Sequence, residues 1–129
     1  MRDTQSALID DQELLEAFYQ EAHDLIAEMG KDLSSLGEER DPTILHRLYR
    51  CAHTIKSSSG SVGYNELHEM TQALEQIFKA ASEGRYEIND EAISLFSASV
   101  DACRRLLHEG KEAAGHKELL ERLNSLIHP

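Results

Sequence analysis

A histidine, His53, lies one helical turn before a lysine, Lys56, in the stretch RCAHTIKSSSGSVGY (residues 50–64), and small hydroxyl residues and glycines follow them. A neutral imidazole has a nucleophilic lone pair. Neighbouring cations favour the neutral ring and can neutralise a phosphoryl group placed on it. The small residues leave room for a second protein to approach closely. These residue types and their spacing suit a surface that carries a phosphoryl group on His53.

The charge pattern of this stretch differs from that of the rest of the chain. The 129 residues have a formal net charge of −11, and acids dominate residues 1–41. Residues 42–65 contain no acid, and they carry Arg47, Arg50 and Lys56. We therefore expect a cationic, hydroxyl-rich surface centred on His53. The alternative that spacing alone leaves open is a solvated helix face that merely contains a histidine.

Apolar residues recur every three or four positions in five segments that glycines and prolines separate, which is the period of an amphipathic helix. The predicted helices cover residues 11–36, 42–59, 64–83, 90–109 and 115–127. Asp10 and Glu13 offer a capping start to the first helix, and Asp41 with Pro42 offers an N-cap and first position to the second. The pattern predicts a single all-α domain over residues 1–129. Its expected architecture is an antiparallel four-helix bundle with the fifth helix packed alongside.

The helical period also places His53. At 100° per residue, the apolar face of the second helix centres near Leu48 and Ile55, so His53 lies almost opposite that face. We therefore expect an exposed imidazole. Its helical neighbours are Tyr49 and Arg50 one turn before, and Lys56 and Ser57 one turn after.

Composition argues against several kinds of partner and location. The negative net charge disfavours nucleic acid or an anionic membrane as the main partner. No apolar run approaches the roughly 18 residues of a membrane span, and the first residues lack the basic-then-apolar pattern of a secretory signal. Cys51 and Cys103 occupy apolar helical positions, so we expect reduced core cysteines in a cytoplasmic protein.

Histidine spacing does not predict a metal site. His46 lies two turns before His53, about 10 Å away along the helix axis, which is too far for two rings to share one ion. The H-x-x-x-H or Cys/His spacing of metal ligands is missing at the other histidines, which are His23, His68, His108, His116 and His128.

The run HTIKSSSGSVG (residues 53–63) resembles the histidine phosphotransfer (HPt) signature H-x-x-K-G-x-x-G. The similarity extends along nearly the whole chain, because ELLEAFYQEAHDLIAEMGKDL resembles the first helix of that family and LHEMTQALEQIFKAASEGRYEIND resembles the third helix and its exit loop. The pattern is most similar to the N-terminal phosphoacceptor domain of CheA-type chemotaxis histidine kinases.

The resemblance implies roles for three residues. His53 matches the histidine whose Nε2 accepts the phosphoryl group, and Lys56 matches the lysine that stabilises that group. Glu75 stands where the family has a glutamate that orients the ring through Nδ1, which would fix the tautomer with Nε2 free. The alternative for Glu75 is an ordinary i,i+4 pair with Lys79.

The resemblance also implies a docking surface for partners, and two residues depart from the family pattern. We expect Tyr49, Arg50, Ser57, Gly60 and Gln72 to contribute to this surface. Ser57 stands where the family usually has glycine, which makes the surface slightly bulkier. Gln72 stands where some CheA-type domains carry a second histidine, so any help from that histidine is missing here.

The expected function is that of a phosphotransfer module in a two-component or chemosensory relay. His53 would receive a phosphoryl group from a kinase ATP-binding domain and pass it to an aspartate of a response-regulator receiver. The alternative is a catalytically silent helical bundle that serves as an interaction domain. Sequence leaves open whether this is a stand-alone protein or a piece of a CheA-type kinase.

The sequence contains no Gly-rich nucleotide loop and no nucleophile elbow. We therefore expect the chain to act only as an intermediate in phosphotransfer, and the sequence leaves open whether it counts as an enzyme. We expect it to bind no cofactor of its own, with ATP and Mg²⁺ supplied by the kinase and receiver partners. We expect no nucleic acid or membrane partner, and an isolated domain that is a monomer.

Overall fold

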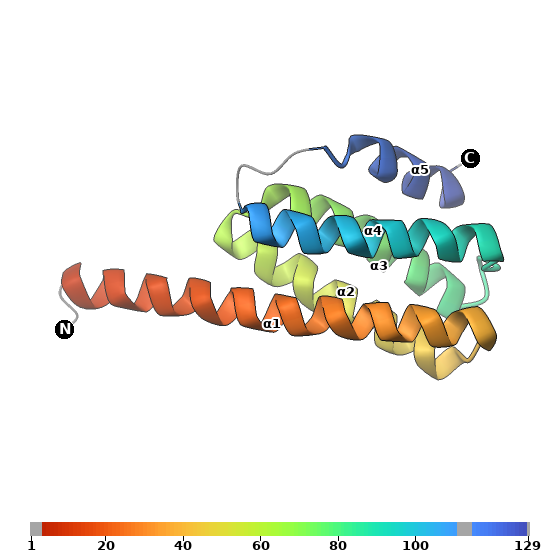
Figure 1. Ribbon diagram of the computed structural model, residues 1–129, viewed down its shortest axis with the longest axis horizontal. Coiled ribbons are helices and arrows are strands. Elements are labelled where there is room, and N and C mark those ends of the chain that lie inside the picture. The colour runs from red at the N-terminus through yellow and green to blue at the C-terminus, as the bar shows by residue number, and fades with distance from the viewer. Residues whose placement is uncertain (1–3, 111–114, 129) are drawn as a thin grey trace.

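The computed structural model describes residues 4–110 and 115–128, with side chains from residue 11 onward, and these residues form five helices and no strand (Figure 1). The helices are α1 (Thr4–Glu38), α2 (Pro42–Val62), α3 (Asn65–Ser82), α4 (Asp90–Glu109) and α5 (Lys117–Ile127). The all-α prediction is therefore confirmed.

The first four helices form the bundle. The most extensive packing joins α2 to α3, while α1 packs against both α2 and α4. The short α5 lies over α3 and α4, on the side away from α1 (Figure 1). This is the antiparallel bundle with an added fifth helix that the apolar period predicts.

A continuous apolar core explains why these helices associate. Its fully buried side chains come from all four long helices, and Phe78 of α3 meets Phe96 of α4 edge to face with ring centroids 5.3 Å apart. Leu123 of α5 is also fully buried, so the fifth helix shares this core. Burying each large apolar side chain contributes roughly 1.5–3 kcal/mol to folding.

The boundaries of α1 differ from the expected ones. The helix begins at Thr4, not at residue 11, so the capping start at Asp10 and Glu13 is wrong. The segment TQSALIDDQELL contains no glycine or proline to stop a helix, and its alanine, leucine and glutamine residues favour one. The first turns of α1 consequently project beyond the bundle (Figure 1).

The expected start of α2 is confirmed, and its end lies later than expected. The Asp41 side chain accepts a hydrogen bond from the Thr43 N–H, with Pro42 at the first helical position. The helix continues past residue 59 to Val62 and stops at Gly63, which has a φ of 83°. That left-handed conformation favours glycine and ends the helix that carries His53 and Lys56.

Both cysteines are buried and unpaired, as expected. Burial raises the pKa of the Cys51 thiol to about 11, and it raises the pKa of the Cys103 thiol to about 12. Neither is therefore a thiolate near neutral pH.

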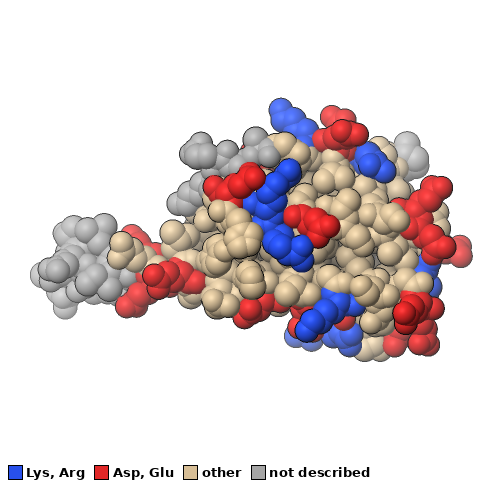
Figure 2. All heavy atoms as spheres, viewed as in Figure 1, with Lys and Arg blue, Asp and Glu red and all other residues tan. Residues whose placement is uncertain are grey.

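On the face shown in Figure 2, acidic side chains are scattered over the surface and along the projecting part of α1, with lysines and arginines between them. Within the part of the chain that the structure describes, no helix combines the length and the apolar character that crossing a bilayer requires.

Candidate functional site

The proposed phosphoacceptor, His53, lies on the outer face of α2. Its side chain is 54% exposed, as the helical period predicts. Its Nδ1–H donates to Oε2 of Glu75 from α3, while no described residue forms a hydrogen bond with its Nε2. The ring is therefore held by one nitrogen and open at the other.

Lys56 completes this group. Its Nζ donates to Oε1 of Glu75 across 2.9 Å, so one carboxylate receives both the imidazole and the ammonium from the next turn of α2. The structure brings together the three residues that the family resemblance singles out. The alternative i,i+4 pair of Glu75 with Lys79 is not formed among the described residues.

Glu75 can serve both groups because α3 presents it toward α2 at the edge of the core. The side chain is only 12% exposed. Burial alone raises the pKa of Glu75, but the hydrogen bonds from Lys56 and His53 outweigh burial and hold that pKa below its usual 4.5. Glu75 is therefore ionised near neutral pH and accepts hydrogen bonds from both partners.

The aromatic ring of Tyr49 lies beside the His53 ring along α2. The two rings are nearly parallel, at 13°, with centroids 6.1 Å apart, and the His46 ring continues the row on the other side of Tyr49 at 6.3 Å. The half-buried Tyr49 thus borders His53 along α2, and its role in docking stays a prediction.

The expected cationic surface is smaller than the sequence indicates. Arg47 points to α1, where its Nη2 lies 2.7 Å from Oδ1 of the buried Asp32. Because Lys56 is paired with Glu75, Arg50 is the one of these three cations without a carboxylate within 4.0 Å among the described residues. Arg50 lines a groove between α1 and α2, and it is exposed there.

The serine hydroxyls after His53 also differ from the expected hydroxyl-rich surface. Ser58 donates to the carbonyl of Thr54, Ser59 to that of Lys56, and Ser61 to that of Ser57. These hydroxyls are used within α2 itself. Ser57, at the position where the family usually has glycine, is exposed.

His68 of α3, for which the sequence predicts no role at the site, explains why residue 60 is a glycine. The His68 Nδ1 lies 2.8 Å from the carbonyl oxygen of Lys56, so Nδ1 carries the proton and donates it. A Cβ added at Gly60 would lie 3.0 Å from that same Nδ1. The glycine inside α2 therefore gives the His68 ring access to the backbone of Lys56. The clue in the sequence was a glycine within a helical segment, where it costs about 1 kcal/mol relative to alanine.

The last expected docking residue, Gln72, is exposed on α3 and lines a groove with Leu120 and Asn124 of α5. It forms no hydrogen bond with His53, Lys56 or Glu75 among the described contacts. The structure therefore places Gln72 toward the α5 side of α3.

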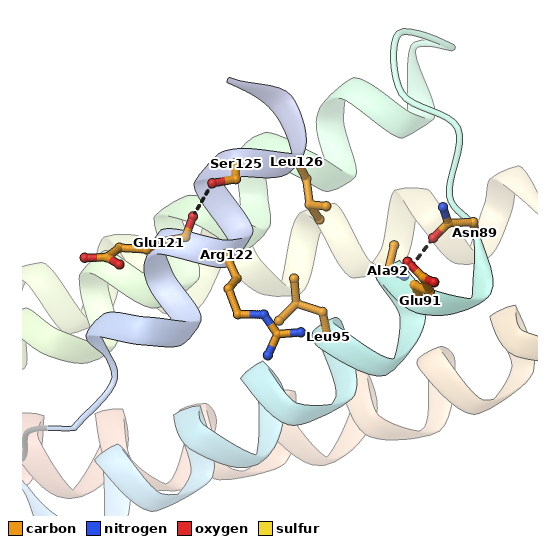
Figure 3. Close-up of a pocket in the computed structure, with 8 residues that line it drawn as sticks. All are labelled: Asn89, Glu91, Ala92, Leu95, Glu121, Arg122, Ser125 and Leu126. Atoms are coloured by element: carbon orange, nitrogen blue, oxygen red, sulfur yellow. Dashed lines mark hydrogen bonds between the residues drawn. The ribbon is translucent and has the colours of Figure 1, made fainter. Parts of the chain in front are cut away.

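His53 is a surface site and not a pocket. Four surface grooves of about 210 to 420 Å³ can be traced over the described residues, and His53 lines none of them. The groove of about 420 Å³ lies between α4 and α5, with Leu95, Leu126 and Arg122 along its walls and no residue from α2 or α3 (Figure 3). None of these four grooves encloses the His53 ring.

The family model described as "Hpt domain" matches residues 13–128, so the chain belongs to the Hpt domain family. Among curated relatives, the chemotaxis protein CheA of Borreliella burgdorferi is 32% identical over 102 residues, or 77% of this chain and 12% of its own length. CheA of Salmonella typhimurium is 30% identical over 106 residues, or 81% of this chain and 16% of its own length. The chain thus spans less than a fifth of these relatives.

A solved structure shares the fold. The phosphorylated P1 domain of CheA3, crystallised in complex with CheY6 from R. sphaeroides, superposes with a TM-score of 0.82 at 20% identity. The match covers 90% of this chain and 96% of that one. The HPt-like bundle expected from the sequence is therefore confirmed.

The contact between Gly60 and His68 can be tested by a double-mutant cycle. Gly60→Ala should stabilise the domain by about 1 kcal/mol in a His68→Ala background, because alanine favours the helix. In the wild type the same change displaces the His68 ring, and we expect that gain to be lost. Urea unfolding of the four proteins measures the coupling. An equal effect of Gly60→Ala in both backgrounds would contradict the contact.

The ionised state of Glu75 predicts a pH dependence of stability. Because its folded pKa is lowered, its contribution is full above the unfolded value of 4.5 and is lost as pH falls through the folded pKa. The stability advantage of the wild type over Glu75→Gln should therefore be full well above pH 4.5 and shrink as the pH falls below that value. Urea unfolding at each pH measures it. A difference that stays constant on both sides of pH 4.5 would refute the assignment.

Proposed function

We propose that this domain carries a phosphoryl group on Nε2 of His53 in a chemotaxis-type phosphorelay. The observation that supports this most directly is that the two nitrogens of the exposed ring differ: Nδ1 is hydrogen-bonded to Glu75, and Nε2 has no hydrogen-bond partner among the described residues. A carboxylate that accepts from Nδ1–H selects the tautomer whose lone pair is on Nε2. That lone pair is the nucleophile.

Transfer from ATP forms one bond to phosphorus and breaks another. Nε2 attacks the γ-phosphorus of ATP held by a separate kinase domain, an N–P bond forms, the bond from phosphorus to the bridging oxygen breaks, and ADP leaves with that electron pair. The ring becomes more positive as the bond forms. The Glu75 carboxylate faces Nδ1–H and stabilises that charge.

Lys56 is suited to neutralising the phosphoryl group. Its ammonium lies one turn from His53 and is bound to the same carboxylate, so it can turn from Glu75 toward an anion on Nε2 by side-chain rotation alone. A phosphoryl group carries more charge than a carboxylate, and this favours that exchange.

A receiver domain is the proposed acceptor. Its aspartate would attack the phosphorus, the N–P bond would break, and His53 would return to the neutral ring. The resemblance to a P1 domain crystallised with CheY6 supports a partner of this class. The relative named sensor histidine kinase CheAY of Helicobacter pylori, 32% identical over 97 residues, supports a kinase ATP-binding domain as the donor. These partners would supply ATP and Mg²⁺.

The direct test is phosphorylation by a CheA-type kinase domain with radiolabelled ATP, followed by a chase with receiver domains. The wild type should take up acid-labile, base-stable label and lose it to a receiver, while His53→Gln should take up none and remain folded because the side chain is exposed. His46→Gln, another exposed histidine on α2, is the matched control and should be labelled normally. Equal labelling of His53→Gln would exclude His53. A wild type that several competent kinases leave unlabelled would favour the silent interaction bundle.

Glu75 is proposed as a positioning residue, so its removal should affect rate more than binding. We expect Glu75→Ala to lower the maximal phosphorylation rate by roughly 10- to 100-fold, the range seen when a carboxylate that orients a metal-bound histidine is removed. The apparent affinity for the kinase should change little. Steady-state phosphorylation against domain concentration separates the two, with Lys79→Ala as the control. An unchanged rate would remove Glu75 from the mechanism.

A further inference from the structure

A second histidine, distant from His53, is directed at two carboxylates. His116 immediately precedes α5 and is only 2% exposed. Its Nε2 lies 2.6 Å from Oε2 of Glu66 and 3.5 Å from Oε2 of Glu69, both on α3. One ligand atom from each residue can be chosen so that all three lie within 4.8 Å of one another.

Two carboxylates of α3 face the same nitrogen of the His116 ring. Glu66 and Glu69 are one turn apart on α3, where like charges repel each other. The buried ring meets them through Nε2, and its Nδ1 has no hydrogen-bond partner among the described residues. The buried imidazole thus makes its polar contacts through Nε2, which lies near both carboxylates.

The donor set matches that of a transition-metal ion. One imidazole nitrogen and two carboxylate oxygens are ligands that Zn²⁺ accepts, and in a tetrahedral zinc site such atoms lie about 3.3 Å apart. The observed contacts of 2.6 and 3.5 Å lie on either side of that spacing. The carboxylates are 33% and 49% exposed, so water can reach a fourth position. The nitrogen ligand disfavours Mg²⁺ and Ca²⁺, which prefer oxygen.

We propose that Glu66, Glu69 and His116 form a binding site for a divalent transition-metal ion of the zinc class. The ion joins the first turns of α3 to the start of α5. The site lies about 9 to 14 Å along α3 from Glu75, so it is separate from the phosphotransfer group. Local spacing could not reveal it, because its histidine is 47 residues from Glu69 in the chain.

The test is Zn²⁺ binding to the chelator-stripped domain, measured by competition with a chromophoric chelator at neutral pH. We expect one ion per wild-type chain. Both His116→Gln and Glu69→Gln should weaken binding at least tenfold. Because Glu69 is half exposed, its variant remains informative even if His116→Gln fails to fold.

Two controls exclude other histidines. His23 of α1 and His108 of α4 are exposed and have ring centroids 6.2 Å apart, so they are the histidine pair that the test must exclude. Binding should be unchanged in His108→Gln and in His46→Gln. Loss of binding in His108→Gln, unchanged binding in His116→Gln, or no binding to the wild type at about 1 mM Zn²⁺ would each overturn the proposal.

The proposal also predicts a structural effect. Because the ion binds the folded arrangement of α3 and α5, saturating Zn²⁺ should raise the thermal midpoint of the wild type and leave that of Glu69→Gln unchanged. Neither readout depends on phosphorylation. A failure of the proposed phosphotransfer function therefore leaves this test intact, and the reverse also holds.

Discussion

The site depends on a single carboxylate that is shared between two helices. Glu75 is almost buried on α3, yet it remains ionised because His53 and Lys56 of α2 both donate to it. An isolated buried carboxylate would be costly, so the two donors stabilise the acid as much as the acid orients the donors. The close packing of α2 on α3 allows these contacts, so the orientation of the His53 ring depends on how the two helices pack.

The helical period predicted most of the fold because the core is built from regular apolar faces. Leu48, Ile55 and Leu74 lie where that period places them, and they are fully buried. The exposed position of His53 follows from the same period. The start of α1 was not predicted because no glycine or proline separates residues 4–10 from the helix that follows them.

Contacts between helices account for what the sequence could not reveal. Arg47 looked like part of a cationic surface, but Asp32 on the neighbouring helix engages it. Gly60 looked like open space for a partner, although its absent side chain makes room for His68. Glu75 was identified through family resemblance, because residues 22 positions apart share no local pattern. In each case the decisive atom lies on another helix.

The serines that follow His53 have a consequence for how partners are chosen. Since the hydroxyls of Ser58, Ser59 and Ser61 turn back to carbonyls of their own helix, this end of α2 has few unmet donors to match with a partner. A poorly matched molecule would leave few donors of this surface unpaired, and a well matched molecule would gain few hydrogen bonds from it. The hydroxyls of these three serines therefore add little to the affinity of any molecule that contacts this end of α2.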